Sequence, residues 1–138
     1  VGTWAYEGSA PAPYAGTETV RPLGEVWILA ECVGTMPGGG PAHTLTTLGF
    51  DPARGRFVGT WVGSMMTHLW TYDGALDADG TSLTLHAEGP DVTGGGGTAR
   101  YRDVITLEGP DRRMLTGLIQ AADGTWRELM TQRYRRTA

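Results

Sequence analysis

Aromatic and titratable side chains gather in the stretch "GTWVGSMMTHLWTYDG", residues 59 to 74. Side chains alternate between the two faces of a β-strand, so His68, Trp70 and Tyr72 are predicted to share one face. Trp61, on the preceding strand, then stands across a hairpin from that row. Aromatic rings offer contact area to an apolar molecule, and an imidazole among them could orient it or act as a base. The stretch therefore allows two interpretations, a packed core hairpin or the wall of a ligand cavity.

A second polar and aromatic row is expected on the last strand. Period-two alternation places five side chains on its inward face: Trp126, Glu128, Met130, Gln132 and Tyr134. A buried carboxylate is costly unless it is paired, so Glu128 is expected to meet Arg100 or Arg102, or to hold a ligand group. Asp103 is a similar case. A structural salt bridge is the favoured interpretation for both acids.

The motifs of common catalytic and metal sites are missing. Ser64 follows Gly63, but there is no G-x-S-x-G pattern and no helix to build a nucleophile elbow. The three histidines fall on different predicted strands without ligand spacing, so no metal is expected; they are His43, His68 and His86. No cofactor is expected either. Haem is disfavoured because only His68 has an aromatic setting and the C-terminal strand has no histidine.

Glycine and proline define the elements that must position these residues. The chain has 22 glycines and 8 prolines, which interrupt its 138 residues at a spacing typical of an all-β sandwich or barrel. The segments between them predict about ten strands joined mostly by short turns: 2–8, 17–24, 25–34, 43–51, 56–63, 66–77, 81–89, 99–109, 113–122 and 125–136. Sequential short connections favour antiparallel neighbours, and closure removes exposed sheet edges. The predicted fold is all-β, a closed antiparallel up-and-down β-barrel of lipocalin type, with one domain over residues 1–138.

Charge and composition narrow the function classes. The net charge of −4 argues against nucleic acid as a partner. The single cysteine, Cys32, lies in the apolar run "EVWILAECV", so a buried inert thiol is expected and an internal disulfide is excluded. No apolar run approaches the roughly 20 residues of a membrane-spanning helix. We expect a cytoplasmic location; because the chain begins at Val1 instead of methionine, a removed N-terminal signal stays an open alternative.

Several motifs indicate a known family. In order along the chain they are "GTWAYEG", "RPLGEVWILAECVG", "LGFDPARGRFVGTWVGSMMT", "YDGALD", "LHAEGPDVTGG" and "QRYRR". Together they resemble the bacterial domain of unknown function fifteen-seventy-nine over nearly the whole chain. The resemblance implies a lipocalin-like or fatty-acid-binding-protein-like barrel and no established activity. The chain departs from the family at Gly63, where an aspartate is common, so any polar role of that aspartate at a cavity is absent here.

We therefore predict a barrel that binds a small apolar or aromatic molecule in its interior. The candidate ligand-binding residues are Trp27, Trp61, His68, Trp70, Tyr72, Tyr101, Glu128, Met130 and Tyr134. Two alternatives remain open. One is a small-molecule enzyme with His68 as its base, which is less favoured. The other is a protein-interaction or oligomerisation module with a packed interior, and a homodimer is compatible with either picture.

Overall fold

Ten strands and the turns between them make up the protein. The computed structural model describes residues 1–138 and contains no helix. The strands are β1 (Gly2–Gly8), β2 (Tyr14–Leu23), β3 (Trp27–Thr35), β4 (Pro41–Asp51), β5 (Arg56–Gly63), β6 (Trp70–Leu76), β7 (Ser82–Pro90), β8 (Thr98–Leu107), β9 (Arg112–Gln120) and β10 (Trp126–Arg136). No helix is therefore present that is long and apolar enough to cross a membrane.

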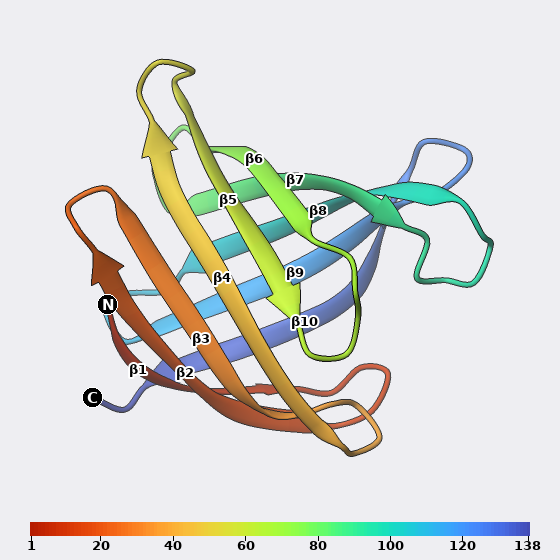
Figure 1. The fold of residues 1–138 in the computed structure, drawn as a ribbon, viewed down its shortest axis with the longest axis horizontal. Helices are drawn as coiled ribbons and strands as arrows, with labels where there is room; N and C mark the ends of the chain where they lie inside the picture. Colours follow the sequence, from red (N-terminus) through yellow and green to blue (C-terminus); the bar gives the residue numbers. More distant parts are fainter.

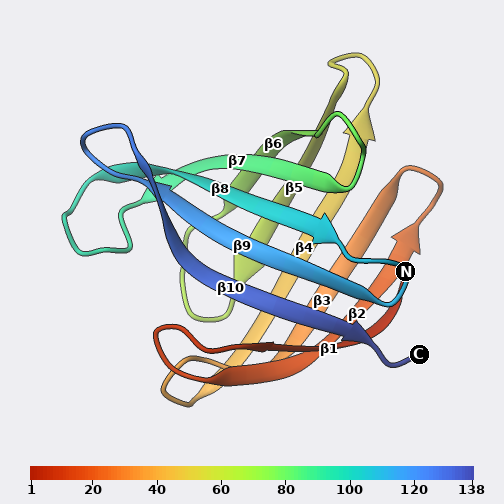
Figure 2. The same cartoon turned by 180° about the vertical axis from the view of Figure 1, so that it is seen from behind.

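The sheet closes on itself. Each strand pairs antiparallel with the next along the chain, and β1 also pairs with β10. Figures 1 and 2 show the strands running round one axis, with both termini at the same end of the barrel. At the closing seam Tyr6 lies opposite Tyr134. The predicted closed antiparallel up-and-down barrel of about ten strands is confirmed.

Alternation along β3 decides which residues face inward. Ile28, Ala30 and Cys32 contact the interior core, so Trp27 and Leu29, at the odd positions, point outward. Trp27 is 39% exposed and covers Gly49, its cross-strand partner on β4. The prediction that Trp27 faces inward is therefore wrong. Glycine has no side chain to cover its own backbone, and an aromatic ring from the neighbouring strand shields that backbone instead.

A β-bulge interrupts the alternation of β10. The register with β9 shifts between Glu128 and Met130, and Leu129 occupies the extra position. Two consecutive residues, Leu129 and Met130, therefore line the interior, while Glu128 is exposed and accepts a hydrogen bond from Thr131 Oγ. The expected inward position of Glu128 is wrong because a strict period of two does not hold through a bulge.

The strand after the β5–β6 turn begins later than expected. Residues 64–69 form the connection and β6 starts at Trp70, so His68 does not lie on the same strand as Trp70 and Tyr72. Two local hydrogen bonds hold this connection: Met66 N–H donates to Gly63 O at 3.3 Å, and Trp70 Nε1 donates to Met66 Sδ at 3.0 Å. His68 rests edge-on against the Trp70 ring, with 4.6 Å between the ring centroids.

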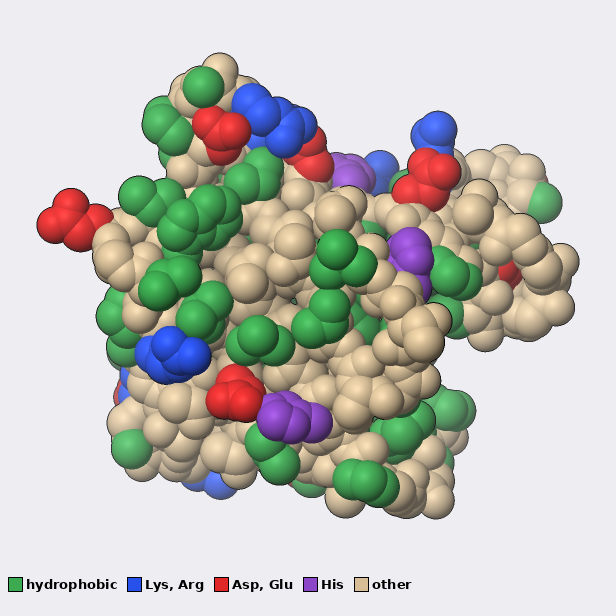
Figure 3. Space-filling model, in the orientation of Figure 1, with side chains coloured by type: hydrophobic (Ala, Val, Ile, Leu, Met, Phe, Trp, Pro, Cys, Tyr) green, Lys and Arg blue, Asp and Glu red, His purple; other side chains and the backbone are tan.

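The outer surface of β3 to β5 carries several hydrophobic side chains, seen in green across the face turned to the viewer in Figure 3. Val33 and Val62 are among the exposed ones. One ion pair interrupts this face, between His43 Nε2 and Glu31 Oε2 at 2.6 Å. The interior core, by contrast, is built from two aromatic clusters centred on Trp4 and Trp70.

Candidate functional site

A cavity of about 1120 Å³ lies inside the barrel and is open to solvent; 44 residues line it, of which 30 are hydrophobic. Every strand contributes to its wall. Pockets that hold drug-sized molecules are usually roughly 300–1,000 Å³ and mostly apolar, so this volume admits a whole small molecule. Ten strands make a wider tube than the eight that side chains alone can fill.

Six of the nine sequence-predicted site residues line this cavity. They are Trp61, Trp70, Tyr72, Tyr101, Met130 and Tyr134. Trp61 lies directly opposite Trp70 across the β5–β6 ladder, as the sequence predicted. The Trp70 and Tyr101 rings meet edge-to-face, with 5.1 Å between their centroids. The Tyr101 hydroxyl is used structurally, because it donates to Pro90 O at 2.5 Å and accepts from Val92 N–H at 3.0 Å.

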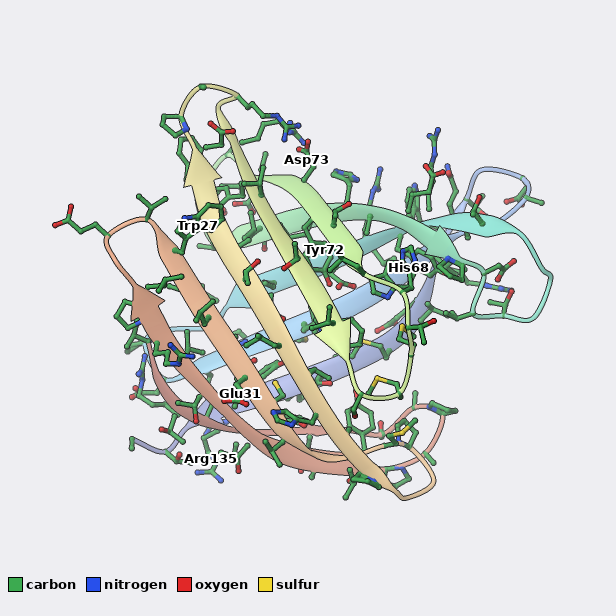
Figure 4. All side chains as sticks on the ribbon, viewed as in Figure 1. Trp27, Glu31, His68, Tyr72, Asp73 and Arg135 are labelled. Carbon is green, nitrogen blue, oxygen red and sulfur yellow. The ribbon has the colours of Figure 1, made fainter.

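The other three predicted residues do not line the cavity: Trp27, His68 and Glu128. Figure 4 labels the first two, on β3 and in the β5–β6 connection. The predicted salt bridges are also absent. Arg102 stacks on the Trp126 ring at 3.9 Å, Arg100 lies 3.9 Å from Glu88, and neither Glu128 nor Asp103 has an arginine partner.

The buried carboxylate that does have an arginine partner is Glu18, which the sequence analysis did not select. Glu18 is only 5% exposed and forms an ion pair with Arg113 inside the barrel. Its other oxygen accepts a hydrogen bond from Cys32 Sγ at 3.2 Å. The Arg113 guanidinium also lies 3.8 Å from the Tyr134 ring centroid. The alternation of Glu18 with Val20 on β2, an inward apolar residue, is the sequence signal that could have revealed its position.

A chain of hydrogen bonds extends this polar cluster. Tyr14 Oη donates to Gln132 Oε1 at 2.8 Å, and Gln132 Nε2 donates to Tyr134 Oη at 2.5 Å. Burial raises the pKa of Tyr134 and holds that of Cys32 above its usual value. These groups therefore stay protonated at neutral pH. The predicted burial of Cys32 is confirmed, and its thiol is a weak nucleophile.

A second polar group stands apart from that cluster. Tyr72 Oη donates to Asp103 Oδ2 at 2.5 Å, and both side chains line the cavity. Asp103 Oδ1 makes no hydrogen bond. Burial raises the pKa of Asp103, and the hydrogen bond from Tyr72 opposes this only in part. Burial at this position disfavours the ionised form of the carboxyl group. The folded protein therefore loses stability when Asp103 is ionised.

Asp103→Asn is therefore expected to stabilise the fold at pH 8, by about 1–3 kcal/mol, the usual penalty of an incompletely partnered buried group. The raised pKa means that the folded protein holds this proton to higher pH than the unfolded chain does. Stability is then lost as pH rises from the ordinary value of 3.8 through the folded pKa. Urea unfolding of both proteins from pH 3 to 8 should show the difference growing with pH. A wild type that is the more stable protein at pH 8 would contradict this account.

The loops at one end of the barrel bring apolar side chains to the cavity wall. These residues are Ala10, Pro11, Met36, Pro37, Met65, Met66 and Val92. Methionine side chains are flexible and adapt easily to contacts of different shapes. Met65 also packs, with Trp61, over Gly63, so this position is covered by the side chains of two large residues.

The remaining titratable groups do not form a second site. His43, His68 and His86 do not line the cavity. His86 pairs across the sheet with Asp73 and Arg102, and burial is the main cause that lowers its pKa. Nowhere do three or more His, Cys, Asp or Glu side chains gather as metal ligands would.

Comparison with known proteins identifies a family and a fold. A family model described as "Protein of unknown function (DUF1579)" matches residues 1–136, the family that the motifs indicated. Among solved structures, a de novo designed fluorescence-activating β-barrel is similar, with a TM-score of 0.52, 17% identity, and coverage of 99% of this chain and 92% of that one. A redesigned β-barrel is also similar, with a TM-score of 0.51, 13% identity, and coverage of 99% and 90%. At these identities the likeness shows the fold alone. No curated protein matches the chain.

Proposed function

Since the chain belongs to the DUF1579 family of proteins of unknown function, which brings no activity with it, we propose a function from the barrel interior. The protein is a carrier or sensor that binds one small, largely apolar molecule inside the barrel. The observation that carries this proposal is the 1120 Å³ cavity with its mostly hydrophobic lining. Removing apolar surface from water contributes a favourable free energy of roughly 25 cal/mol for each Å². An apolar ligand of matching size therefore gains substantial binding free energy when it enters the cavity.

The polar groups of the wall support a binding role over a purely structural one. A barrel stabilised only by packing would gain nothing from Asp103, whose second oxygen has no partner. Groups of this kind usually fix the orientation of a ligand in an otherwise apolar pocket. The designed barrel of similar fold is described as fluorescence-activating. A barrel of this fold has therefore been designed for a purpose beyond structure, and its support for the proposal goes no further than that.

The two alternatives receive less support. The enzyme hypothesis relied on His68 as a base inside the barrel, and His68 does not line the cavity. The interaction-module hypothesis relied on a packed interior, whereas this interior is hollow. A base acting on a bound molecule would have to be Asp103, the one acid of the wall without a cationic partner.

A space-filling substitution tests the proposal. Thr46 lines the cavity from β4, while its neighbour Leu45 points outward, paired with Val62 of β5. Thr46→Phe places a phenyl ring in the cavity and is expected to weaken binding of the neutral dye N-phenyl-1-naphthylamine about tenfold or more, by taking up ligand volume. Dye fluorescence, titrated against protein, gives the Kd.

Leu45→Phe is the matched control, because it adds the same ring on the outside of the same strand. It should bind the dye as the wild type does. Equal losses in both variants, or no binding of the dye by the wild type, would contradict interior binding.

A further inference from the structure

The charged side chains of the cavity wall are not all paired with an opposite charge. Four line it: Glu18, Asp103, Arg113 and Arg136. Arg113 is held by Glu18. Arg136 Nε lies 3.2 Å from Asp111 Oδ1, and its Nη1 donates to Val1 O at 2.6 Å. Both arginines are therefore occupied, and Asp103 is the only charged side chain of the wall without an opposite charge.

This balance is unfavourable to an anionic ligand. A carboxylate entering the barrel would find no free guanidinium, and Asp103 would repel it whenever ionised. A cationic ligand meets the opposite situation. Asp103 Oδ2 is fixed by Tyr72, which leaves Oδ1 to accept a hydrogen bond from the ligand. A charge-assisted N⁺–H···O⁻ bond would neutralise the one unpaired acid of the interior.

The aromatic lining favours the same ligand chemistry. The tryptophans and tyrosines that line the cavity are Trp4, Tyr6, Tyr14, Trp61, Trp70, Tyr72, Tyr101 and Tyr134. The electron-rich faces of such rings attract cations, most strongly where water is excluded. The protein already uses this attraction inside the barrel, where the Arg113 guanidinium lies 3.8 Å from the Tyr134 ring centroid and 4.7 Å from that of Trp4.

We propose that the molecule bound in the barrel is an apolar amine, whose protonated nitrogen pairs with Asp103 Oδ1 while its hydrophobic body contacts the aromatic wall. This inference rests on the proposed function and narrows it to one ligand class. It also gives a reason for an unpartnered acid in an apolar interior, because a binding group often reduces the stability of the empty protein.

Three probes of one shape separate the charge from the apolar body: 2-naphthylmethylamine, 2-naphthalenemethanol and 2-naphthoate. Calorimetric titration at pH 7.5 should show the amine binding about 10- to 100-fold more tightly than the alcohol, the usual range for a hydrogen bond to a charged group. The naphthoate should bind more weakly than the alcohol. Asp103→Asn should lose the preference for the amine while its affinity for the alcohol stays within about threefold of wild type.

Tyr72→Phe is the matched variant, since it removes the neighbouring hydroxyl but keeps the carboxylate; it should still prefer the amine. Near-ultraviolet circular dichroism of both variants checks that the tryptophan-rich interior is intact. Equal affinities for amine and alcohol in the wild type, or an amine preference that survives in Asp103→Asn, would overturn this inference and leave the proposed function standing. Binding of none of the three probes would overturn both.

Discussion

Glu18→Gln is expected to lower the free energy of unfolding by about 3–5 kcal/mol, the range seen when one partner of a buried ion pair is removed. Glu18 is the only carboxylate that meets Arg113, which would remain charged inside the barrel. The Cys32 thiol would also lose the charge on its acceptor. Although burial lowers the pKa of Arg113, a guanidinium does not deprotonate at neutral pH, so the charge cannot be relieved. Urea denaturation followed by tryptophan fluorescence measures the loss.

The double variant Glu18→Met/Arg113→Met is the control. It removes both charges and replaces them with apolar side chains of similar length. Buried pairs replaced in this way often cost little or nothing, so the double variant should recover most of the stability lost by the single one. A double variant as unstable as Glu18→Gln would show that packing at these positions matters and that the charge pairing does not.

Gly59→Ala is expected to destabilise the barrel by about 3 kcal/mol, at the upper end of the cost of overpacking. A β-carbon at Gly59 would overlap the carbonyl oxygen of Thr47 on β4, and backbone paired in a ladder cannot move aside without breaking the sheet. The close approach marks a place where the sheet bends to close. Thermal unfolding at one pH, followed by circular dichroism, provides the comparison with wild type.

Gly117→Ala is the matched test of that reasoning. Gly117 also lies inside a strand, but its added β-carbon would meet Met130 Sδ at 3.0 Å, the end of a flexible side chain. Because Met130 can adopt another rotamer beside an open cavity, a loss of about 1 kcal/mol or less is expected. If both glycine variants lose the same stability, the specific clash at Gly59 is not the cause.

The closed barrel was predictable because its signals are local. Turn residues at regular spacing and short connections between apolar strands leave an antiparallel meander as the simplest arrangement. Asp-Gly at residues 79–80 and 123–124 lies at two of these turns, where Gly80 and Gly124 have φ values of 75° and 87°. Closure then follows from the need to pair the first strand with the last, and β1 pairs with β10 as that argument requires.

The direction in which individual side chains point was harder to predict. On β3 both faces carry apolar residues, so alternation fixes two sets but does not say which is inside, and Trp27 was assigned to the wrong one. On β10 the bulge after Glu128 changes the phase within one strand. The late start of β6 moves His68 into a connection. In each case the orientation of the side chain depends on a contact with a neighbouring strand or loop, and the local sequence does not indicate that contact.

The partner of Glu18 illustrates the same limit at longer range. The alternation of Glu18 with Val20 points to the interior, but Arg113 lies near the start of β9. The two meet only because β1 and β10 join the ends of the sheet. A prediction of this pair would have required the register of the closed barrel, which follows from the pairing of all ten strands.

Methyl NMR of the protein titrated with 2-naphthylmethylamine tests most directly whether the ligand lies within the tube. Ring-current shifts should appear at the methyl groups of Leu85 and Ile105, which line the cavity, and leave those of Val33 and Val62, which are exposed, unchanged. Shifts confined to Val33 and Val62 would place the amine on the outer face of β3 to β5 and contradict the account.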